Sequence, residues 1–275
     1  MIDFHCHILP GLDDGARSFD ESVEMAKIAE SDGITEIVCT PHIKKGYATP
    51  TLKAISEAAS ELQSLLESAG IHIRLHPAAE VALERNLADL IDRGEMPTVG
   101  GDSRYILLEL PWQGIPDYTG TVISELLSSG VTPIIAHLER YHDIIVDPAL
   151  AWEFVEMGAL AQINSGSITG MFGEGVQTTA LTLVSHGVAH VIGSDAHSSG
   201  RRCPQLRAAR DVVEAMGGKD YADRLFYLNA AEILAGMQFK PQEPKAYEGP
   251  RPADRRSTLF RKLAFYISRQ LHGLR

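Results

Sequence analysis

Seven short apolar runs rich in β-forming residues recur along this chain, and their spacing limits the folds it can adopt. We predict strands at these runs, at residues 2–4, 36–40, 73–79, 105–110, 132–136, 160–163 and 189–193. Helical spacing of apolar residues predicts helices at residues 22–31, 52–68, 117–129, 148–157 and 176–186. Strands alternating with helices indicate parallel βαβ units. Seven units within about 235 residues favour a closed or nearly closed (β/α) barrel over an open doubly wound sheet.

Side chains able to bind a metal follow six of these seven predicted strands. They are His5, His7, His42, Glu80, Glu109, His137, Asp195 and His197. His5 and His7 are two apart on a strand, so their side chains share a face and Cys6 points away from it. Any one of the eight is explained as well by a helix cap or a solvated loop residue. Eight of them on the rim where barrel active sites are built predict a metal site.

The make-up of this set indicates the kind of metal chemistry. Histidine and carboxylate ligands without cysteine suit Zn, Mn or Fe. Eight ligands are too many for one ion, so we expect two or three ions that share bridging carboxylates. Such clusters polarise a phosphoryl group and generate hydroxide at neutral pH. Asp13 and Asp14 lie in a turn that leaves the first ligand strand, and either could fold back onto a metal.

Three arginines near these residues are candidates for binding a phosphate. Arg140 follows His137 by three residues, and Arg201 and Arg202 follow His197. Arginine matches phosphate oxygens in bidentate fashion, although a single arginine is more often a surface residue. Position beside the predicted ligands favours Arg140 and Arg202 as functional residues.

The three cysteines do not supply a phosphatase nucleophile. A cysteine-dependent phosphatase needs an arginine six residues after the cysteine, and those positions hold Leu12, Lys45 and Ala209. We therefore expect a metal-activated water to be the nucleophile. The cysteines are also too few and too scattered for a disulfide framework, which predicts a reducing cytoplasm as the compartment.

Charge divides the chain into an acidic body and a basic tail. The 275 residues carry a net charge of −11, which argues against nucleic-acid binding by the body. Residues 240–275 hold nine basic and three acidic residues, a net charge of +6, and this leaves −17 for residues 1–239. The chain has no apolar run of about 18 residues that would predict a membrane span, and no signal-peptide pattern.

These motifs resemble the PHP (polymerase and histidinol phosphatase) superfamily, through His5-x-His7, His42, Glu80, His137 and Asp195-x-His197. More closely, the chain is similar to the bacterial capsular-polysaccharide tyrosine phosphatases of that superfamily. The matching stretches are Asp-Asp-Gly at 13–15, Thr-Pro-His at 40–42, Asp-Ser-Arg-Tyr at 102–105, Pro-Ile-Ile-Ala-His-Leu-Glu-Arg-Tyr at 133–141, Gln-Ile-Asn-Ser at 162–165 and Ser-Asp-Ala-His at 194–197. The resemblance covers roughly residues 1–236.

The resemblance implies a distorted (β/α)7 barrel with three divalent metal ions, Mn²⁺ first and Fe, Zn or Mg as alternatives. It implies one ion on His5, His7, Glu80 and Asp195, a second on Glu80, Glu109 and His137, and a third on Asp14, His42 and His197. It favours Asp14 over Asp13. The expected catalytic residues are Arg140, Arg202, His42 and Asp195, and the expected phosphate-binding residues are Arg140, Arg201 and Arg202. This branch usually has Arg-Pro-Pro where the chain has Arg202-Cys203-Pro204, so the choice between Arg201 and Arg202 stays open.

The activity implied is that of a protein-tyrosine phosphatase, a phosphoric monoester hydrolase. Family relatives act on the tyrosine-rich tail of a membrane-bound tyrosine kinase that regulates polysaccharide export. One alternative is a phosphatase of a small metabolite such as histidinol phosphate. A second is a non-catalytic metal-binding or adaptor module, but no predicted ligand is missing. A third is a metal-dependent amidohydrolase, but the lysine expected at a mid-barrel strand end is absent.

The C-terminal region has a pattern of its own. We predict a phosphatase barrel at residues 1–239, a proline-rich extended linker at 240–256 and a basic amphipathic helix at 257–275. In that helix an apolar stripe lies under basic residues, a pattern typical of helices on anionic membranes or acidic partners. We expect the tail to tether a cytoplasmic enzyme weakly to the inner membrane face or to the kinase. Docking of the helix on the acidic body is the alternative.

Overall fold

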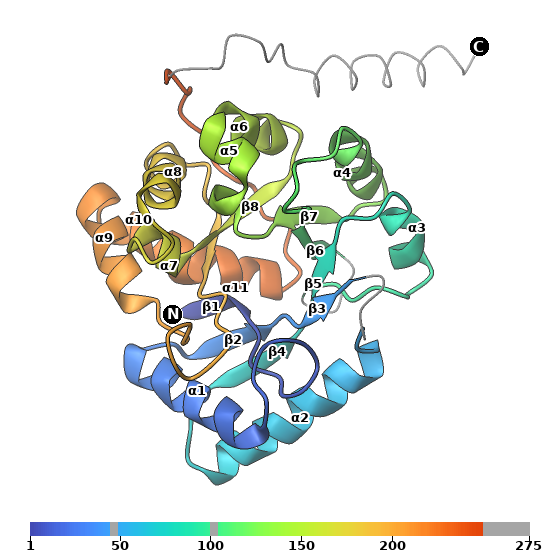
Figure 1. Cartoon of the computed structure of the whole chain (residues 1–275), viewed down its shortest axis with the longest axis vertical. Coiled ribbons are helices and arrows are strands. Elements are labelled where there is room, and N and C mark those ends of the chain that lie inside the picture. The colour runs from blue at the N-terminus through green and yellow to red at the C-terminus, as the bar shows by residue number, and fades with distance from the viewer. Residues whose placement is uncertain (45–48, 100–103, 250–275) are drawn as a thin grey trace.

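A ring of parallel strands surrounded by helices forms the protein (Figure 1). The computed structural model describes residues 1–44, 49–99 and 104–249. Among these residues no helix is both long enough and apolar enough to cross a membrane. The strands found there are β1 (Ile2–Cys6), β2 (Glu36–Cys39), β3 (His42–Ile43), β4 (Arg74–Pro77), β5 (Glu80–Ala82), β6 (Tyr105–Glu109), β7 (Thr132–Ile135), β8 (Leu160–Asn164) and β9 (Val191–Gly193).

Hydrogen bonds connect these strands all the way round. One sheet has the order β1-β2-β4 and the other the order β3-β5-β6-β7-β8-β9. Because β2 continues into β3 and β4 into β5, the two sheets are joined on one side. On the other side Asp195 N donates to His5 O at 2.7 Å and His7 N donates to Ala196 O at 2.9 Å, which joins the ends of β9 and β1. The ring has seven strand positions, so the predicted distorted (β/α)7 barrel is confirmed.

The second and third predicted strands are each broken in two, which the sequence analysis did not expect. β2 and β3 are separated by Thr40 and Pro41, and β4 ends at Pro77. Proline has no N–H to donate to a neighbouring strand, so it interrupts the hydrogen bonding at both breaks. The chain resumes pairing at once, with Glu80 N donating to Pro41 O. The breaks therefore bend the sheet without opening it.

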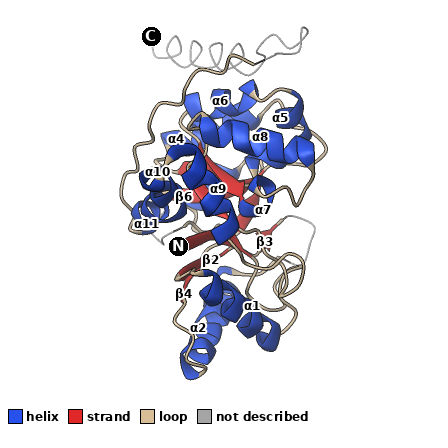
Figure 2. Cartoon of the chain, turned by 90° about the vertical axis from the view of Figure 1, so that its left-hand side faces the viewer, coloured by secondary structure: helices blue, strands red, loops and turns tan. Residues whose placement is uncertain are grey.

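Helices cover the outside of the strands (Figure 2). They are α1 (Phe19–Asp32), α2 (Leu52–Ser68), α3 (Leu87–Asp92), α4 (Thr119–Ser128), η1 (Leu138–Arg140), α5 (His142–Val146), α6 (Ala149–Glu156), α7 (Ser165–Ile168), α8 (Glu174–Ser185), α9 (Arg207–Gly217), α10 (Lys219–Asp223), η2 (Arg224–Leu228) and α11 (Asn229–Leu234). The five predicted helices correspond to α1, α2, α4, α6 and α8. The helices of residues 207–234 were not predicted, and neither were the short helices α3, α5 and α7.

Apolar side chains form two layers, one between strands and helices and one inside the barrel. The inner layer includes Ile2, Phe4, Leu107 and Ile134, all buried. Ile233 of α11 packs against the same layer and closes the end of the barrel where the strands begin. Burying this layer removes apolar surface from water, the main stabilising contribution to folding. The inside is therefore filled at one end, and the polar side chains gather at the other.

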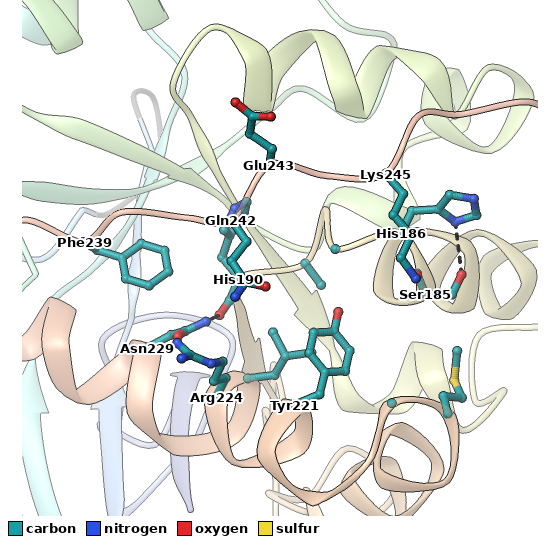
Figure 3. A pocket seen from close by; sticks show the side chains of 15 residues that line it. Ser185, His186, His190, Tyr221, Arg224, Asn229, Phe239, Gln242, Glu243 and Lys245 are labelled. Carbon is teal, nitrogen blue, oxygen red and sulfur yellow. Dashed lines mark hydrogen bonds between the residues drawn. The ribbon is translucent and has the colours of Figure 1, made fainter.

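Residues 237–249 form a strap along the molecule's surface, without helix or strand. Tyr105 Oη donates to Met237 O at 2.6 Å and accepts from Phe239 N at 2.8 Å. Further on, Trp152 Nε1 donates to Lys245 O at 2.7 Å, and Lys245 N donates to His186 O at 2.8 Å. The strap forms one wall of a cavity of about 460 Å³. Tyr221 and Arg224 line the cavity below it in the view of Figure 3.

The strap covers part of the predicted linker. Residues 240–249 contain no helix or strand, and Lys245 is fixed to the barrel by hydrogen bonds with Trp152 and His186. The rest of the predicted linker (250–256) and the predicted tail helix (257–275) lie outside the described residues.

Candidate metal centre

His5 and His7 lie side by side at the end of β1, with ring nitrogens Nε2 3.0 Å apart. A β-bulge between Asp3 and Cys6 shifts the register of β1 against β2. Phe4 belongs to the inner apolar layer and Cys6 to the outer one, so the two histidines face the barrel interior as predicted. Gly193 of β9 makes room for them, since a Cβ there would lie 2.5 Å from His5 Cβ.

The first cluster of donor atoms combines these histidines with two carboxylates. Glu80 Oε2 lies 3.2 Å from His5 Nε2 and 3.4 Å from His7 Nε2. Asp195 Oδ1 lies 3.7 Å and 3.6 Å from the same two nitrogens. Atoms bound to one ion at about 2.1 Å lie roughly 3.0–3.5 Å apart. The four side chains therefore surround a point that one metal ion could occupy.

Glu80 also faces a second group with its other oxygen. Its Oε1 lies 2.8 Å from His137 Nε2. Its Oε2 lies 3.0 Å from His42 Nδ1, and Glu109 Oε2 lies 4.0 Å from the same nitrogen. Glu80 is thus in the position of a bridging carboxylate. In the described structure Glu109 is grouped with His42 and Glu80, whereas the resemblance groups it with Glu80 and His137.

A third group stands at the outer side of the rim. Asp14 Oδ1 lies 3.6 Å from His42 Nε2 and 3.5 Å from His197 Nε2. Donor atoms of His7, Asp14, His42 and His197 all lie within 4.8 Å of one another. All nine predicted ligands are therefore brought together in three overlapping groups.

Two buried ring nitrogens show that hydrogen bonding alone does not complete this arrangement. His42 Nδ1 is close to Glu80 Oε2 but makes no hydrogen bond, and His137 Nδ1 has no partner in the described structure. Unpaired buried polar atoms are costly. For His42, the ring nitrogen and the carboxylate oxygen lie 3.0 Å apart without a hydrogen bond, which is the spacing of two ligands of one metal ion. The donor set fits divalent ions.

The electrostatics of the cluster agree with this fit. Burial alone would raise the pKa of Glu80, but the charges of His5 and His137 outweigh it and hold this pKa well below its usual value. Burial opposes ionisation of Asp195 too, but the nearby His7, the charges of His5 and His137 and the charge of Arg202 lower its pKa well below normal. Both carboxylates stay ionised because positive charge surrounds them. Metal ions supply such charge without protonating the histidines that must ligate them.

The backbone is unusual at two of the predicted ligands. His137 has φ 35° and Asp195 has φ 54°, and they are the non-glycine residues with positive φ in the described chain. A non-glycine residue rarely adopts this conformation, and it costs free energy where it occurs. Each lies two residues after the end of a barrel strand, His137 after β7 and Asp195 after β9, and turns its side chain into the cluster.

Side chains behind the ligands hold them in position, and the sequence analysis did not assign them this role. Asp13 Oδ2 accepts from His7 Nδ1 at 2.6 Å and from His42 N at 2.9 Å. Gln162 Oε1 lies 3.0 Å from His5 Nδ1 and accepts from His137 N at 2.8 Å. Such partners fix the orientation of a ligating imidazole. Asp13 thus faces the back of His7, whereas Asp14 faces the donor atoms. The signal in the sequence for Gln162 was a polar residue at an inward position of an apolar strand.

Arg140 and Arg202 converge on one carboxylate oxygen. Arg140 Nη1 and Arg202 Nη2 lie 2.7 Å and 2.9 Å from Asp195 Oδ2. Arg202 Nη2 also donates to Asp195 O at 2.9 Å. Arg201 is exposed and has no hydrogen bond or ion pair with the cluster in the described structure. Of the two neighbours, Arg202 is therefore the one at the site.

The comparisons with known proteins agree on one family. The chain matches the family described as "Capsular polysaccharide synthesis, CpsB/CapC" over residues 1–235. It is 34% identical over 258 residues to the tyrosine-protein phosphatase YwqE of Bacillus subtilis (strain 168), covering 93% of this chain and 98% of that protein. It is 30% identical over 240 residues to the tyrosine-protein phosphatase CpsB of Streptococcus pneumoniae, covering 85% and 98%.

A solved structure agrees with these relatives. The fold superposes with a TM-score of 0.86 and 34% identity on a structure from work on YwqE of Bacillus subtilis and CpsB of Streptococcus pneumoniae, described as unique metal-dependent tyrosine phosphatases. The match covers 90% of this chain and 100% of the other. The family match over residues 1–235 includes every strand that carries a predicted ligand.

Proposed function

Because this chain belongs to the CpsB/CapC family of capsular polysaccharide synthesis, we propose that it is a metal-dependent protein-tyrosine phosphatase, a phosphoric monoester hydrolase. The resemblance predicted from the sequence motifs is confirmed by this membership. The observation that carries the proposal is the set of three overlapping donor groups with two arginines at the same rim. Its relatives YwqE and CpsB are named tyrosine-protein phosphatases.

We propose that the site holds three divalent ions, with Mn²⁺ as the working metal. His5, His7, Glu80 and Asp195 would hold the first ion, Glu80, Glu109 and His137 the second, and Asp14, His42 and His197 the third. The distances from Glu80 to His5 and to His137, the distance from Asp14 to His197 and the two-sided position of Glu80 support this assignment. Glu109 is assigned to the second ion by the resemblance, and it lies beside His42 and Glu80. When bound, such ions polarise phosphoryl oxygens and lower the pKa of bound water to near neutrality.

The protein's own groups would position the phosphate. Arg140 and Arg202 both contact Asp195 Oδ2, so their guanidinium groups lie close together. One phosphoryl group at the rim could therefore accept hydrogen bonds from both. Their charge would stabilise the negative oxygens of the transition state. Arg201 stands outside this arrangement. Asp13 and Gln162 would keep His7 and His5 in the ligating orientation.

We further propose that the substrate is a phosphotyrosine protein, a membrane-bound bacterial tyrosine kinase that controls capsule or exopolysaccharide synthesis. The family description, which concerns capsular polysaccharide synthesis, supports this choice. The protein would then act in the cytoplasm, at the inner face of the membrane. Three free cysteines, two of them buried on adjacent strands, agree with a reducing compartment.

The test compares substrates and metal states of the purified chain. We expect hydrolysis of a phosphotyrosine peptide to exceed that of histidinol phosphate, to be lost after exhaustive chelation and to return with Mn²⁺. His137→Ala should lose most of the activity together with bound metal, whereas the matched control His142→Ala should not, because His142 is exposed on α5. Full activity after chelation, or a preference for histidinol phosphate, would refute the proposal.

A further inference from the structure

A cavity of about 620 Å³ opens directly beside the donor groups. Asp14, His42 and Glu109 line its polar side, where the proposed metal ions would bind. Leu12 and Trp112 also line it, and they come from the loops that follow β1 and β6. A phosphoryl group bound at the donors would leave much of this volume for the group to which it is attached.

Trp112 is an exposed aromatic residue that is nevertheless fixed in place. It is 41% exposed, among the larger apolar exposures of the described chain. Its Nε1 donates to Glu109 Oε1 at 2.9 Å, and its ring stacks on His137 with centroids 5.0 Å apart and planes at 21°. Tyr141 packs at 5.2 Å. An aromatic side chain that is held rigid with part of its surface open offers contact area at little entropic cost.

The same indole also contacts one of the two arginines at the rim. The guanidinium carbon of Arg140 lies 5.0 Å from the Trp112 ring centre and 4.2 Å from that of Phe172, while its Nη1 reaches Asp195. Arginine over an aromatic face is a favourable contact. The apolar surface of the cavity and the phosphate-binding arginine are therefore parts of one packed unit. A ligand held through its phosphate by Arg140 would have its substituent beside Trp112.

We propose that this cavity is a subsite for an aryl group, and that Trp112 selects phenyl phosphates over phosphate esters without a ring. The inference rests on the proposed function and names the part of phosphotyrosine that the protein recognises. A phenyl ring buries apolar surface against Trp112 and Leu12. Its contact with the Trp112 ring adds a favourable aromatic interaction to the free energy gained by burying that surface. The short side chain of phosphoserine or phosphothreonine leaves that surface exposed to water.

The test measures binding without turnover. The probes are two otherwise identical peptides, one with phosphonomethyl-phenylalanine and one with an aliphatic phosphonate, titrated calorimetrically into Mn²⁺-loaded full-length protein. Trp112→Ala and Trp112→Leu should raise the Kd of the aryl peptide by about tenfold or more and the Kd of the aliphatic peptide by less than about twofold. Trp112→Phe should retain most of the aryl affinity. Tyr227→Ala is a matched control, because Tyr227 is a similarly exposed aromatic residue, 44% exposed, on η2.

Metal content separates this role from a structural one. Trp112 also donates a hydrogen bond to Glu109, so its removal could act through the metal site. Phenylalanine lacks that N–H but keeps a ring, so retained affinity in Trp112→Phe assigns the effect to the ring. If every variant bound both peptides with equally reduced affinity and lost Mn²⁺ in parallel, the proposal would be overturned. A wild-type protein that binds the two peptides equally well would overturn it too.

A parallel turnover assay distinguishes failure of this inference from failure of the proposed function. If the wild type binds the aryl peptide through Trp112 but does not hydrolyse phosphotyrosine, the function is wrong and the subsite stands. If it hydrolyses phosphotyrosine and Trp112→Ala keeps the wild-type ratio of kcat/KM for that peptide over acetyl phosphate, a ring-free substrate, the function stands and the subsite is wrong.

Discussion

At the scale of single residues, the site separates side chains that face the donor atoms from side chains that hold them. Asp13 and Asp14 are adjacent in the sequence, yet Asp14 lies 3.5 Å from His197 Nε2 while Asp13 lies behind His7. A hydrogen bond from His7 Nδ1 to a carboxylate keeps the other ring nitrogen, Nε2, free to ligate. Two chemically identical neighbours therefore have different roles, because Asp13 contacts His7 Nδ1 and Asp14 lies among the donor atoms of His7, His42 and His197.

Asp13→Asn should weaken metal binding while leaving the fold intact. The two oxygens of Asp13 accept from three N–H groups, those of His7 Nδ1, His42 N and Gly15 N. Asparagine keeps one acceptor oxygen and presents an NH2 donor in place of the other, so at least one of these contacts is lost and the neutral amide holds the His7 tautomer less strongly. We expect the apparent affinity for Mn²⁺ to fall by about 10- to 100-fold, measured by metal titration of phosphotyrosine hydrolysis. The control Asp20→Asn removes an exposed charge in the first turn of α1 and should leave the affinity unchanged. Wild-type affinity in Asp13→Asn would mean that the contact is not needed for ligation.

At the scale of elements, some ends of helices and strands are determined by distant parts of the chain. The first residues of α9 have no capping side chain of their own. Asp32, the last residue of α1, supplies the cap instead, with its Oδ2 accepting from Leu206 N at 2.6 Å and Arg207 N at 2.8 Å. A local search for a capping residue before residue 207 therefore finds nothing, which is one physical reason why α9 is hard to predict.

Asp32→Ala should destabilise the protein through α9. Two backbone N–H groups at the start of the helix would lose their acceptor, at a cost of about 1–2 kcal/mol. For a chain of this size we expect a decrease in Tm of roughly 2–8 °C, measured by thermal unfolding of the metal-loaded protein. Asp211→Ala, on the exposed side of the same helix, should change stability by less than about 0.5 kcal/mol. If both variants unfold like the wild type, the cap contributes nothing.

At the scale of the whole molecule, the strap decides where the barrel ends and the basic tail begins. Trp152 and His186 hold Lys245, so residues 240–249 are part of the folded body. The tail that remains, residues 250–275, carries most of the basic charge of the C-terminal region. A truncation that removes the tail without cutting into the folded body should therefore end after Gly249, rather than at the start of the predicted linker.

A chain ending at Gly249 should lose membrane binding and keep its activity. Each basic residue near an anionic surface contributes about 1 kcal/mol, and salt screens it. We expect the full-length chain to bind phosphatidylserine vesicles at low salt in a sedimentation assay and the shortened chain not to bind. Hydrolysis of a soluble phosphotyrosine peptide should be equal in the two. Absence of vesicle binding by the full-length chain, with a lower Tm after shortening, would indicate instead that the tail packs on the acidic body.

The sequence by itself determined the barrel and the rim. Period-two and helical patterns identify parallel βαβ units, and in such a barrel the ends of the strands must meet at one rim. Residues that directly follow strands, such as His42 and His137, are therefore assigned to a common site without coordinates. The pairing of His5 with His7 follows from strand geometry alone, because alternate side chains share a face.

Only the tertiary structure decided what depends on contacts between distant segments. It brought Arg202 and not Arg201 to Asp195, placed Gln162 behind His5, and turned Trp112 toward the cavity beside Glu109. It also required glycine at position 193, where a Cβ would meet His5. A local pattern can mark such a position, as the polar Gln162 does in an apolar strand, but it does not identify the partner, because each role is set by the distance and direction of an atom far away in the sequence. Local pattern fixes which face a residue occupies, and packing fixes which partner it meets there.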